Sequence, residues 1–398
     1  MRWQVRPVSV TNTEEARREI ALVGADDWGC KIMAPKAVYR LLKVTGLAPW
    51  QANILKQEML ARGGEAAVSR GCINCSVEST DVLLMGTVTH YRSLARKLLI
   101  QPFGLPELGA RLRCVVDNLE QESLPDLDCR GIVLPLSKRT LVMGILNVTP
   151  DSFSDGGLFM TPESALARAR RMVEEGADII DLGGESTRPG HTPVPAEVET
   201  ARILPVLRLL VRELPVPVSV DTSKAAVARA ALEAGAHVIN DQWALRDPGM
   251  AELVAGAGVS VVLMHNREKA VYRDLMGEVW SYFEERVELA LKSGISERQL
   301  ILDPGFGFGK TPAHNLEILR RLGELKGFGL PILIGTSRKS TIGKVLDLPV
   351  DQRLEGTAAT VAVGIAGGAG IVRVHDVLAM TRVARMTDAI LRGWDENG

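Results

Sequence analysis

Polar side chains that could bind or activate a substrate stand at the ends of short apolar segments in this chain of 398 residues. The first such segment, 141–147, breaks into a polar loop at Asn147. In barrels and sheets of parallel strands, the carboxyl ends of the strands carry the chemistry. A single polar residue there often only caps the next helix. The pattern recurs, however, and predicts one shared site built from Asn147, Asp181, Asp221, Asn240, His265 and Asp303.

Several loops after these segments carry groups suited to an anion. Segment 181–190 combines glycines, which let backbone N–H groups approach a ligand, with Arg188, whose planar guanidinium can hold phosphate. Later loops add Lys339, Arg373 and His375. Barrels often bind phosphate after their last two strands. A structural ion pair would explain Arg373 and His375 about as well if they stood alone, but together these residues favour an anion site.

Segment 303–311 nearly imitates a phosphate-binding P-loop. That motif requires a glycine where this chain has Pro304, so we reject an ATP cradle. We interpret Asp303 instead as a carboxylate that grips a flat amino-heterocycle, with Phe308 as a wall of the pocket. Lys339 could reach a ring carbonyl or a phosphate of the same ligand.

The elements that position these residues alternate strictly after residue 135. Amphipathic helical patterns fill the gaps between the apolar segments, which predicts a (β/α)8 TIM barrel over 135–398, with a doubly wound open sheet as the alternative. The expected strands are 141–147, 178–182, 217–221, 237–241, 259–264, 300–303, 331–334 and 371–374.

Residues 1–134 show a mixed pattern, typical of a small α+β domain of unassigned function. One strand is expected at 81–85, and a hairpin at 131–138 is expected to plug the bottom of the barrel. Cys72 and Cys75 form a single CxxC, more typical of ordinary thiols than of a zinc site, which needs a second ligand pair. Helices are expected at 14–22, 36–44, 50–62, 90–99 and 105–119.

The amino-acid composition of the chain limits the kinds of binding partner and the cellular compartment to expect. A net charge of −1 and 4% aromatic residues give no reason to expect nucleic acid as a partner. Five cysteines, an odd number, favour a reducing compartment over a disulfide framework. The first residues lack the apolar core of a signal peptide, and no segment suits a membrane span. These features predict a cytoplasmic protein.

Segments 141–157 and 181–190 resemble the two signatures of dihydropteroate synthases, and the similarity extends from about residue 140 to the C-terminus. The resemblance implies condensation of 6-hydroxymethyl-7,8-dihydropterin diphosphate with p-aminobenzoate to 7,8-dihydropteroate and pyrophosphate, a step of folate biosynthesis. It also implies Mg2+ as cofactor, a homodimer and a target of sulfonamides.

The resemblance assigns roles to individual residues. The pterin pocket would use Asp221, Asn240, Met264, Asp303 and Lys339. The pyrophosphate site would use Asn147, Thr187, Arg188, Arg373 and His375, with Mg2+ on the Asn147 oxygen. The p-aminobenzoate site would use Phe153, Thr187, Arg188, Pro189, Phe308 and Ser337. The catalytic set would be Asn147, Asp221, Asp303, Lys339, Arg373 and His375.

Three features depart from the family pattern. Gln242-Trp243 stands where an aliphatic residue usually follows the Asn-Asp pair, and 265–274 carries more charge than usual. Neither is expected to touch a residue assigned to chemistry. Residues 1–134 lie outside the resemblance. Two other functions remain open: a pterin-dependent methyltransferase on a similar barrel, and a pterin carrier without turnover.

Overall fold

The structure is a computed structural model that describes residues 3–148, 161–185 and 194–394. The chain forms two compact units: residues 1–122 with 327–329, and residues 123–326 with 330–398. The division falls at Glu122, before the boundary expected at residue 134. The reason is that the intervening residues form a hairpin that packs with the second unit.

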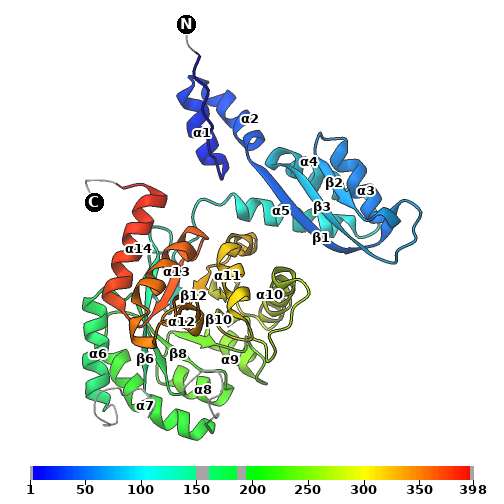
Figure 1. Ribbon diagram of the computed structural model, residues 1–398. Coiled ribbons are helices and arrows are strands. Elements are labelled where there is room, and N and C mark those ends of the chain that lie inside the picture. The colour runs from blue at the N-terminus through cyan, green and yellow to red at the C-terminus, as the bar shows by residue number, and fades with distance from the viewer. Residues whose placement is uncertain (1–2, 149–160, 186–193, 395–398) are drawn as a thin grey trace. The chain divides into compact units, whose positions relative to one another are not determined.

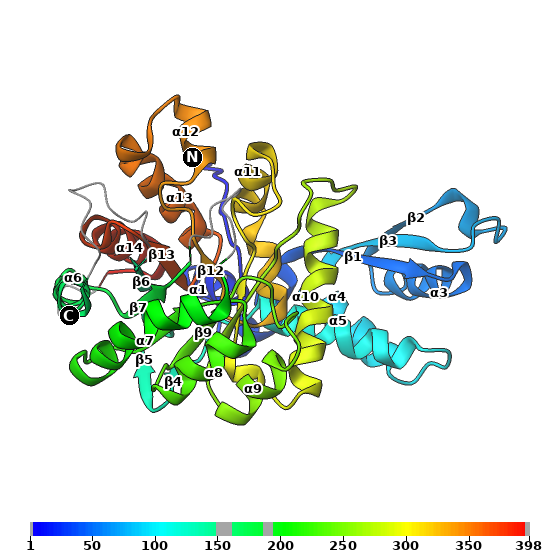
Figure 2. The ribbon, with the colours of Figure 1, turned by 90° about the horizontal axis from the view of Figure 1, so that it is seen from below.

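The first unit is a small α+β domain around a three-stranded antiparallel sheet in the order β1-β3-β2. Helix α3 lies along this sheet (Figure 2). The strands are β1 Tyr39–Leu47, β2 Glu65–Val68 and β3 Thr80–Thr87. The helices are α1 Thr13–Leu22, α2 Asp27–Ala37, α3 Pro49–Leu60, α4 Val88–Leu98 and α5 Leu105–Leu119, with a 3-10 turn η1 at Arg70–Cys72.

The expected helix over 36–44 is wrong, because most of this segment forms strand β1. Tyr39 and Leu41 are exposed on one face of β1, and β1 pairs with β3 from Tyr39↔Thr87 onward. The buried Tyr91 hydroxyl lies 2.9 Å from the carbonyl oxygens of both Leu84 and Arg40, so its one O–H can donate to either, and it ties α4 to both strands. Pairing with a distant strand thus overrides the local helical pattern.

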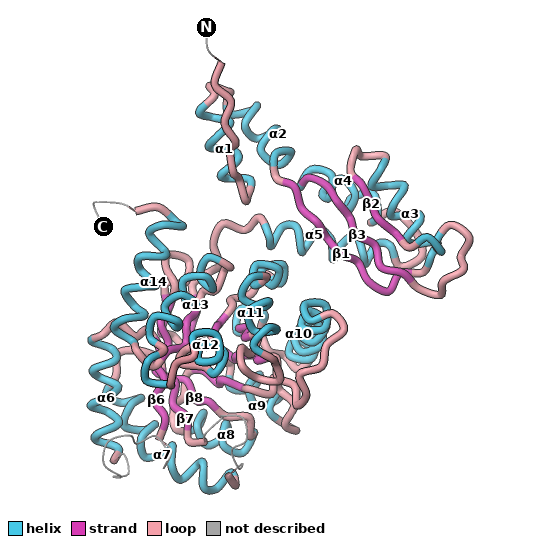
Figure 3. The backbone as a smooth tube through the Cα atoms, viewed as in Figure 1, coloured by secondary structure: helices cyan, strands magenta, loops and turns pink. Residues whose placement is uncertain are grey.

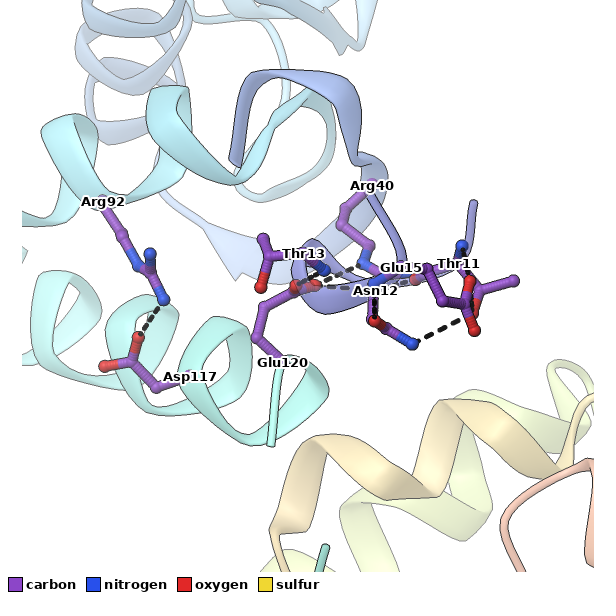
Figure 4. Close-up of polar contacts among 8 residues, drawn as sticks. All are labelled: Thr11, Asn12, Thr13, Glu15, Arg40, Arg92, Asp117 and Glu120. Carbon is purple, nitrogen blue, oxygen red and sulfur yellow. Dashed lines mark hydrogen bonds and ion pairs between the residues drawn. The ribbon is translucent and has the colours of Figure 1, made fainter. Parts of the chain in front are cut away.

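Glu120 joins three parts of the first unit (Figure 4). Its carboxylate accepts from the backbone N–H of Thr13 at 2.9 Å and from Nη2 of Arg40 at 2.7 Å. The side chain is only 4% exposed. At the start of α1, Asn12 accepts from the N–H of Glu15 at 2.9 Å and caps the helix. Glu120 therefore fixes the first turn of α1 and strand β1 against the end of α5.

The second unit is the predicted barrel. Its eight parallel strands run in the order β11-β10-β9-β8-β7-β6-β13-β12, and a parallel bridge between Leu302 and Ile332 joins the two ends. The strands are β6 Leu141–Asn147, β7 Ile179–Gly183, β8 Val218–Asp221, β9 Val238–Asp241, β10 Ser260–Met264, β11 Leu300–Asp303, β12 Leu333–Ile334 and β13 Ile371–Val374.

Helices surround these strands, as Figures 1 and 3 show for the barrel. None of the helices within the described ranges has the length and apolarity to cross a membrane. The helices are α6 Pro162–Glu174, α7 Ala196–Glu213, α8 Ala225–Glu233, α9 Met250–Ala257, α10 Leu275–Lys292, α11 Pro312–Arg320, α12 Ser340–Leu346, α13 Leu354–Ala366 and α14 Val377–Arg392, with 3-10 turns η2 Glu297–Gln299, η3 Leu322–Phe328 and η4 Val350–Gln352.

A hairpin closes the amino-terminal end of the barrel, as expected, although it begins earlier in the chain. Its strands are β4 Leu127–Cys129 and β5 Ile132–Leu134. The apolar side chains of Leu127 and Leu134 join one buried cluster with residues from the barrel strands. One end of the barrel is therefore sealed by apolar contacts, and the polar strand ends lie at the other.

Candidate active site

Strand register brings the polar strand ends into neighbouring positions. Asn147 pairs with Gly183, Gly183 pairs with Asp221, and Asp221 pairs with Asn240 along four adjacent strands. Further round the barrel, Met264 pairs with Asp303. Residues paired in adjacent parallel strands lie at the same height, so these side chains share one rim. These strands are buried and mostly apolar before this point, so the polar groups at their ends stand out.

Arg373, on β13, lies at the centre of a buried ionic cluster. Its Nε donates to Asp181 at 2.5 Å and its Nη2 donates to Asp221 at 2.8 Å. The amide of Asn240 also donates to Asp181, at 3.1 Å. Both carboxylates are buried, with Asp221 only 5% exposed. The residue expected to bind pyrophosphate is thus paired with two carboxylates.

The surroundings of Asp221 disfavour its negative charge. Burial raises the pKa of Asp221 to about 7, since water no longer solvates the charged form; Arg373 opposes this shift and the negative charge of Asp181 adds to it. A carboxyl group that titrates near neutral pH at a strand end is typical of a functional site. Burial likewise raises the pKa of Asp303.

Asp303 and Lys339 form the opposite side of the rim. Asp303 accepts from the N–H of Gly305 at 2.7 Å. Lys339 donates to the carbonyl of Phe306, and its ammonium lies 4.1 Å from the centre of the Phe308 ring. Burial lowers the pKa of Lys339 to about 8, with Asp303 opposing the shift. A carboxylate, a cation and an aromatic ring thus gather where a flat polar ligand could be held.

His375 and Ser337 meet beside this cluster. Nδ1 of His375 lies 3.0 Å from the Ser337 hydroxyl, which also accepts from the N–H of His375 at 3.2 Å. Next to them, Nε of Arg338 donates to Asp376 at 2.9 Å. Both contacts join the loop after β12 to the loop after β13. The structure therefore brings together the loops that follow the last two strands.

The side-chain oxygen of Asn147 lies close to β7 because Gly183 has no side chain. A methyl group added at Gly183 would lie 2.8 Å from Oδ1 of Asn147. An amide oxygen at a strand end suits Mg2+, which takes most of its ligands from phosphate and water. In the described part of the chain, no group of three His, Cys, Asp or Glu side chains could hold a metal ion.

Four predicted site residues lie outside the described residues: Phe153, Thr187, Arg188 and Pro189. The residues that flank 186–193 are described and firmly held. Glu185 accepts from the N–H of Val194 at 3.2 Å and is paired with Lys224, which also donates to Glu199 at 2.6 Å. Glu199 is 1% exposed. This network fixes both ends of the segment to the start of α8.

Lys310 is a structural residue that the sequence did not reveal. Its ammonium lies 2.8 Å from Nδ1 of His265 and donates to the carbonyls of His265, Gly305 and Phe308 at 3.0–3.3 Å. Burial lowers the pKa of His265 to about 2, so the ring is neutral and Nδ1 accepts. His265, grouped with the other strand ends from sequence, thus serves to anchor the glycine-rich loop.

Gln242 contradicts an expectation from the sequence. Its amide Nε2 donates to Oδ1 of Asp221 at 2.7 Å, so a residue set aside as a departure touches a residue assigned to chemistry. The contact requires the pairing of β8 with β9, which places Gln242 one residue beyond the strand that adjoins Asp221. The sequence did contain a signal for this contact, because Gln242 is a polar residue that directly follows a strand of the site.

Comparison with known proteins identifies the barrel. The pterin binding enzyme family profile matches residues 143–375. The dihydropteroate synthase of Bacillus subtilis (strain 168) is 51% identical over 259 residues, which are 65% of this chain and 91% of that protein. The chain belongs to the dihydropteroate synthase family of pterin-binding enzymes. Like its relatives, it is a transferase.

Solved structures agree with this assignment. The dihydropteroate synthase of Xanthomonas albilineans with 4-aminobenzoic acid is 47% identical, with a TM-score of 0.65 over 67% of this chain and 98% of that one. The same enzyme in complex with 7,8-dihydropteroate gives 46% identity and a TM-score of 0.62, also over 67% of this chain and 98% of that one.

The N-terminal unit also has a counterpart. A probable bifunctional folylpolyglutamate synthase/dihydropteroate synthase of Halobacterium salinarum is 41% identical over 393 residues, which are 97% of this chain and 47% of that protein. Residues 1–134 were expected from the sequence to lie outside the family resemblance. This match, which covers 97% of the chain, shows instead that at least one relative carries a region similar in sequence to residues 1–134.

Proposed function

We propose that the cluster around Asp221, Asp303, Lys339 and Arg373 performs the dihydropteroate synthase reaction of the family. The observation that carries this proposal is the gathering of two buried carboxylates and two cations at the carboxyl end of one barrel. The substrates would be 6-hydroxymethyl-7,8-dihydropterin diphosphate and p-aminobenzoate, and the products 7,8-dihydropteroate and pyrophosphate.

The pterin ring would bind to Asp221, Asn240, Asp303 and Lys339, with Met264 against its face. Carboxylates accept hydrogen bonds from ring N–H groups, and these charge-assisted bonds are stronger than neutral ones. The same negative charges would favour positive charge on the pterin as the diphosphate departs. Support comes from the burial of Asp221 and Asp303, because a low-dielectric setting strengthens both effects.

The departing diphosphate would bind to Arg373 and His375 and to Thr187 and Arg188. Arg373 would exchange a carboxylate partner for phosphate oxygens when the substrate enters. Asn147 would hold Mg2+, which when bound would neutralise charge on the diphosphate. The place of Asn147 at the carboxyl end of β6, level with Gly183 and Asp221 on the neighbouring strands, supports this placement.

p-Aminobenzoate would bind between Phe153, Thr187, Arg188, Pro189, Phe308 and Ser337. The C–O bond to the diphosphate breaks, the nitrogen of p-aminobenzoate bonds to the same exocyclic carbon, and that nitrogen loses a proton. No covalent bond to the protein is needed. The binding of 4-aminobenzoic acid and of 7,8-dihydropteroate by the Xanthomonas albilineans enzyme supports both substrate classes.

The direct test is to incubate the chain with dihydropterin diphosphate, p-aminobenzoate and Mg2+ and to measure pyrophosphate and dihydropteroate. One pyrophosphate per dihydropteroate is expected. A pterin-dependent methyltransferase would release no pyrophosphate, and a carrier would bind the pterin without turnover.

We further infer that the enzyme works in the cytoplasm and that it is a homodimer. Sedimentation analysis of the purified protein would check the oligomeric state. We expect sulfonamides to compete with p-aminobenzoate, as a structure of the Yersinia pestis enzyme with a sulfonamide suggests.

Removal of Mg2+ is expected to lower kcat/KM at least about 100-fold, because electrostatic stabilisation of developing charge is worth this much at a single site. Assays with and without a chelator measure the loss, and added Mg2+ should restore the rate. Pyrophosphate release that continued at the same rate in excess chelator would contradict the assignment of Asn147 as a metal ligand.

The rate is expected to fall on the acid side of neutrality. Because the pKa of Asp221 is raised to about 7, its carboxylate is ionised above that pH and protonated below it. A protonated Asp221 binds ring N–H groups less well. The profile of kcat/KM for the pterin substrate should therefore lose about tenfold for each pH unit below the pKa. A profile flat down to pH 5 would contradict this role.

A further inference from the structure

We infer that Gln242 is a positioning residue for the known reaction, which keeps the Asp221 carboxylate oriented and ionised for the pterin when Arg373 turns to the departing diphosphate. This inference rests on the proposed roles of Asp221 and Arg373. It concerns a residue that is not among the proposed substrate contacts.

The two oxygens of Asp221 have different partners. Oδ2 accepts from Nη2 of Arg373 at 2.8 Å, and Oδ1 accepts from Nε2 of Gln242 at 2.7 Å. If Arg373 moves to phosphate, Oδ2 becomes available to a ring N–H group, while Gln242 still holds Oδ1. Each carboxylate oxygen can accept a second hydrogen bond, so Gln242 need not leave when the pterin binds.

The turn that carries Gln242 is rigid. The buried Asp241 carboxylate accepts from the N–H of Trp243 at 2.9 Å and of Leu245 at 2.6 Å. Ala244 and Leu245 both have positive φ, 53° and 62°, a strained conformation that surrounding contacts must hold. Local strain of this kind is concentrated at functional sites. Gln242 is thus presented to Asp221 by a fixed backbone.

Cation–π contacts of Arg246 with two aromatic rings also stabilise this turn. The guanidinium carbon of Arg246 lies 5.3 Å from the ring centre of Trp243 and 5.4 Å from that of Tyr282, on α10. Such cation–π contacts add to the stability of the arrangement. The unusual dipeptide therefore works as a unit: Trp243 anchors the turn through Arg246, and Gln242 points its amide at the site.

The charges that face Asp221 explain why a neutral donor is useful. Burial raises its pKa most, Arg373 on β13 lowers it, and Asp181 on β7 and Glu199 on α7 raise it further. Lys339, before α12, also interacts with it electrostatically. Gln242 lowers the pKa through a hydrogen bond that adds no charge to compete with the pterin. Without this donor, loss of Arg373 would leave the buried carboxyl group prone to protonation.

The test replaces Gln242 with an aliphatic residue. In Gln242→Leu, KM for dihydropterin diphosphate should rise about tenfold, the worth of one hydrogen bond to a charged group. KM for p-aminobenzoate should stay within about twofold. The acid limb of kcat/KM should move to higher pH by about one unit, because an unassisted carboxylate takes up a proton more readily. Gln352→Leu, a change at an exposed residue of η4, is the matched control and should alter neither quantity.

A double-mutant cycle separates this inference from the proposed function. In an Asp221→Asn background, Gln242→Leu should cause no further loss, since its effect passes through Asp221. Full additivity, or an unchanged KM and pH limb in Gln242→Leu, would overturn the inference. If the wild type released no pyrophosphate, the proposed function would fail, yet pH-dependent calorimetric binding of a pterin would still decide the role of Gln242. If Gln242→Leu did not fold, Gln242→Met would take its place.

Discussion

Asp221→Asn is expected to lower kcat/KM for dihydropterin diphosphate about 1,000-fold. Several effects combine in this loss. An amide forms weaker hydrogen bonds than a carboxylate to ring N–H groups, each difference amounting to about 1 kcal/mol. The neutral side chain also no longer favours positive charge on the pterin, and removal of one electrostatic group at a reacting centre costs about 100- to 1,000-fold.

The same substitution should leave the fold intact. Arg373 keeps Asp181 as a partner, so no buried cation is left without a carboxylate. Asp347→Asn is the matched control, because Asp347 is exposed at the end of α12 with φ of 55°, a conformation that Asn adopts readily. Steady-state kinetics and far-UV circular dichroism on both variants make the comparison. Near-normal turnover by Asp221→Asn would show that Asp221 does not grip the pterin.

Lys310→Met is expected to lower the free energy of unfolding of the barrel by about 3 kcal/mol. The ammonium contacts His265 Nδ1 and three carbonyl oxygens, and each buried acceptor left without a donor costs about 1–3 kcal/mol. The net loss is smaller than the sum of these costs because water that enters the site can donate to some of the acceptors. Activity should fall as well, since the loop that Lys310 anchors carries Phe308 and the carbonyl of Phe306 that Lys339 contacts.

Backbone contacts make this loop hard to rebuild. A methyl group at Gly305 would lie 2.0 Å from the carbonyl oxygen of His265, and one at Gly309 would lie 2.0 Å from that of Arg267. The backbone of the glycine-rich loop therefore contacts the backbone of the segment after β10 directly. Lys310 stabilises this contact through its hydrogen bonds. Lys344→Met on α12 is the control, because Lys344 is exposed. Denaturant titrations of both variants give the free energies, and equal midpoints would contradict the anchoring role.

The barrel could be predicted from the sequence because its strands are buried on both faces. Such strands are continuous apolar runs, and their polar ends stand out. Segment 300–303 was expected as a strand and is β11, and 141–147 is β6 with Asn147 at its end. These patterns are local, so the strands can be found without knowing which other strands they pair with.

The N-terminal unit was harder to predict because its elements depend on distant partners. Segment 36–44 has a pattern compatible with a helix, yet it pairs with β3 more than thirty residues later along the chain. Helix α2 was missed although Asp26 caps it, with the N–H of Gly29 donating to its carboxylate at 2.6 Å. Short elements with few apolar residues leave weak local signals, and packing decides among them.

The sequence alone determined the barrel strands, the chemical types at their ends and the family, because each depends on residues close together in the chain. Only the tertiary structure decided which polar groups touch. The bond from Gln242 to Asp221 and the anchoring of His265 by Lys310 both join different strands. Such contacts depend on strand register, in which a shift by one residue turns every side chain to the opposite face.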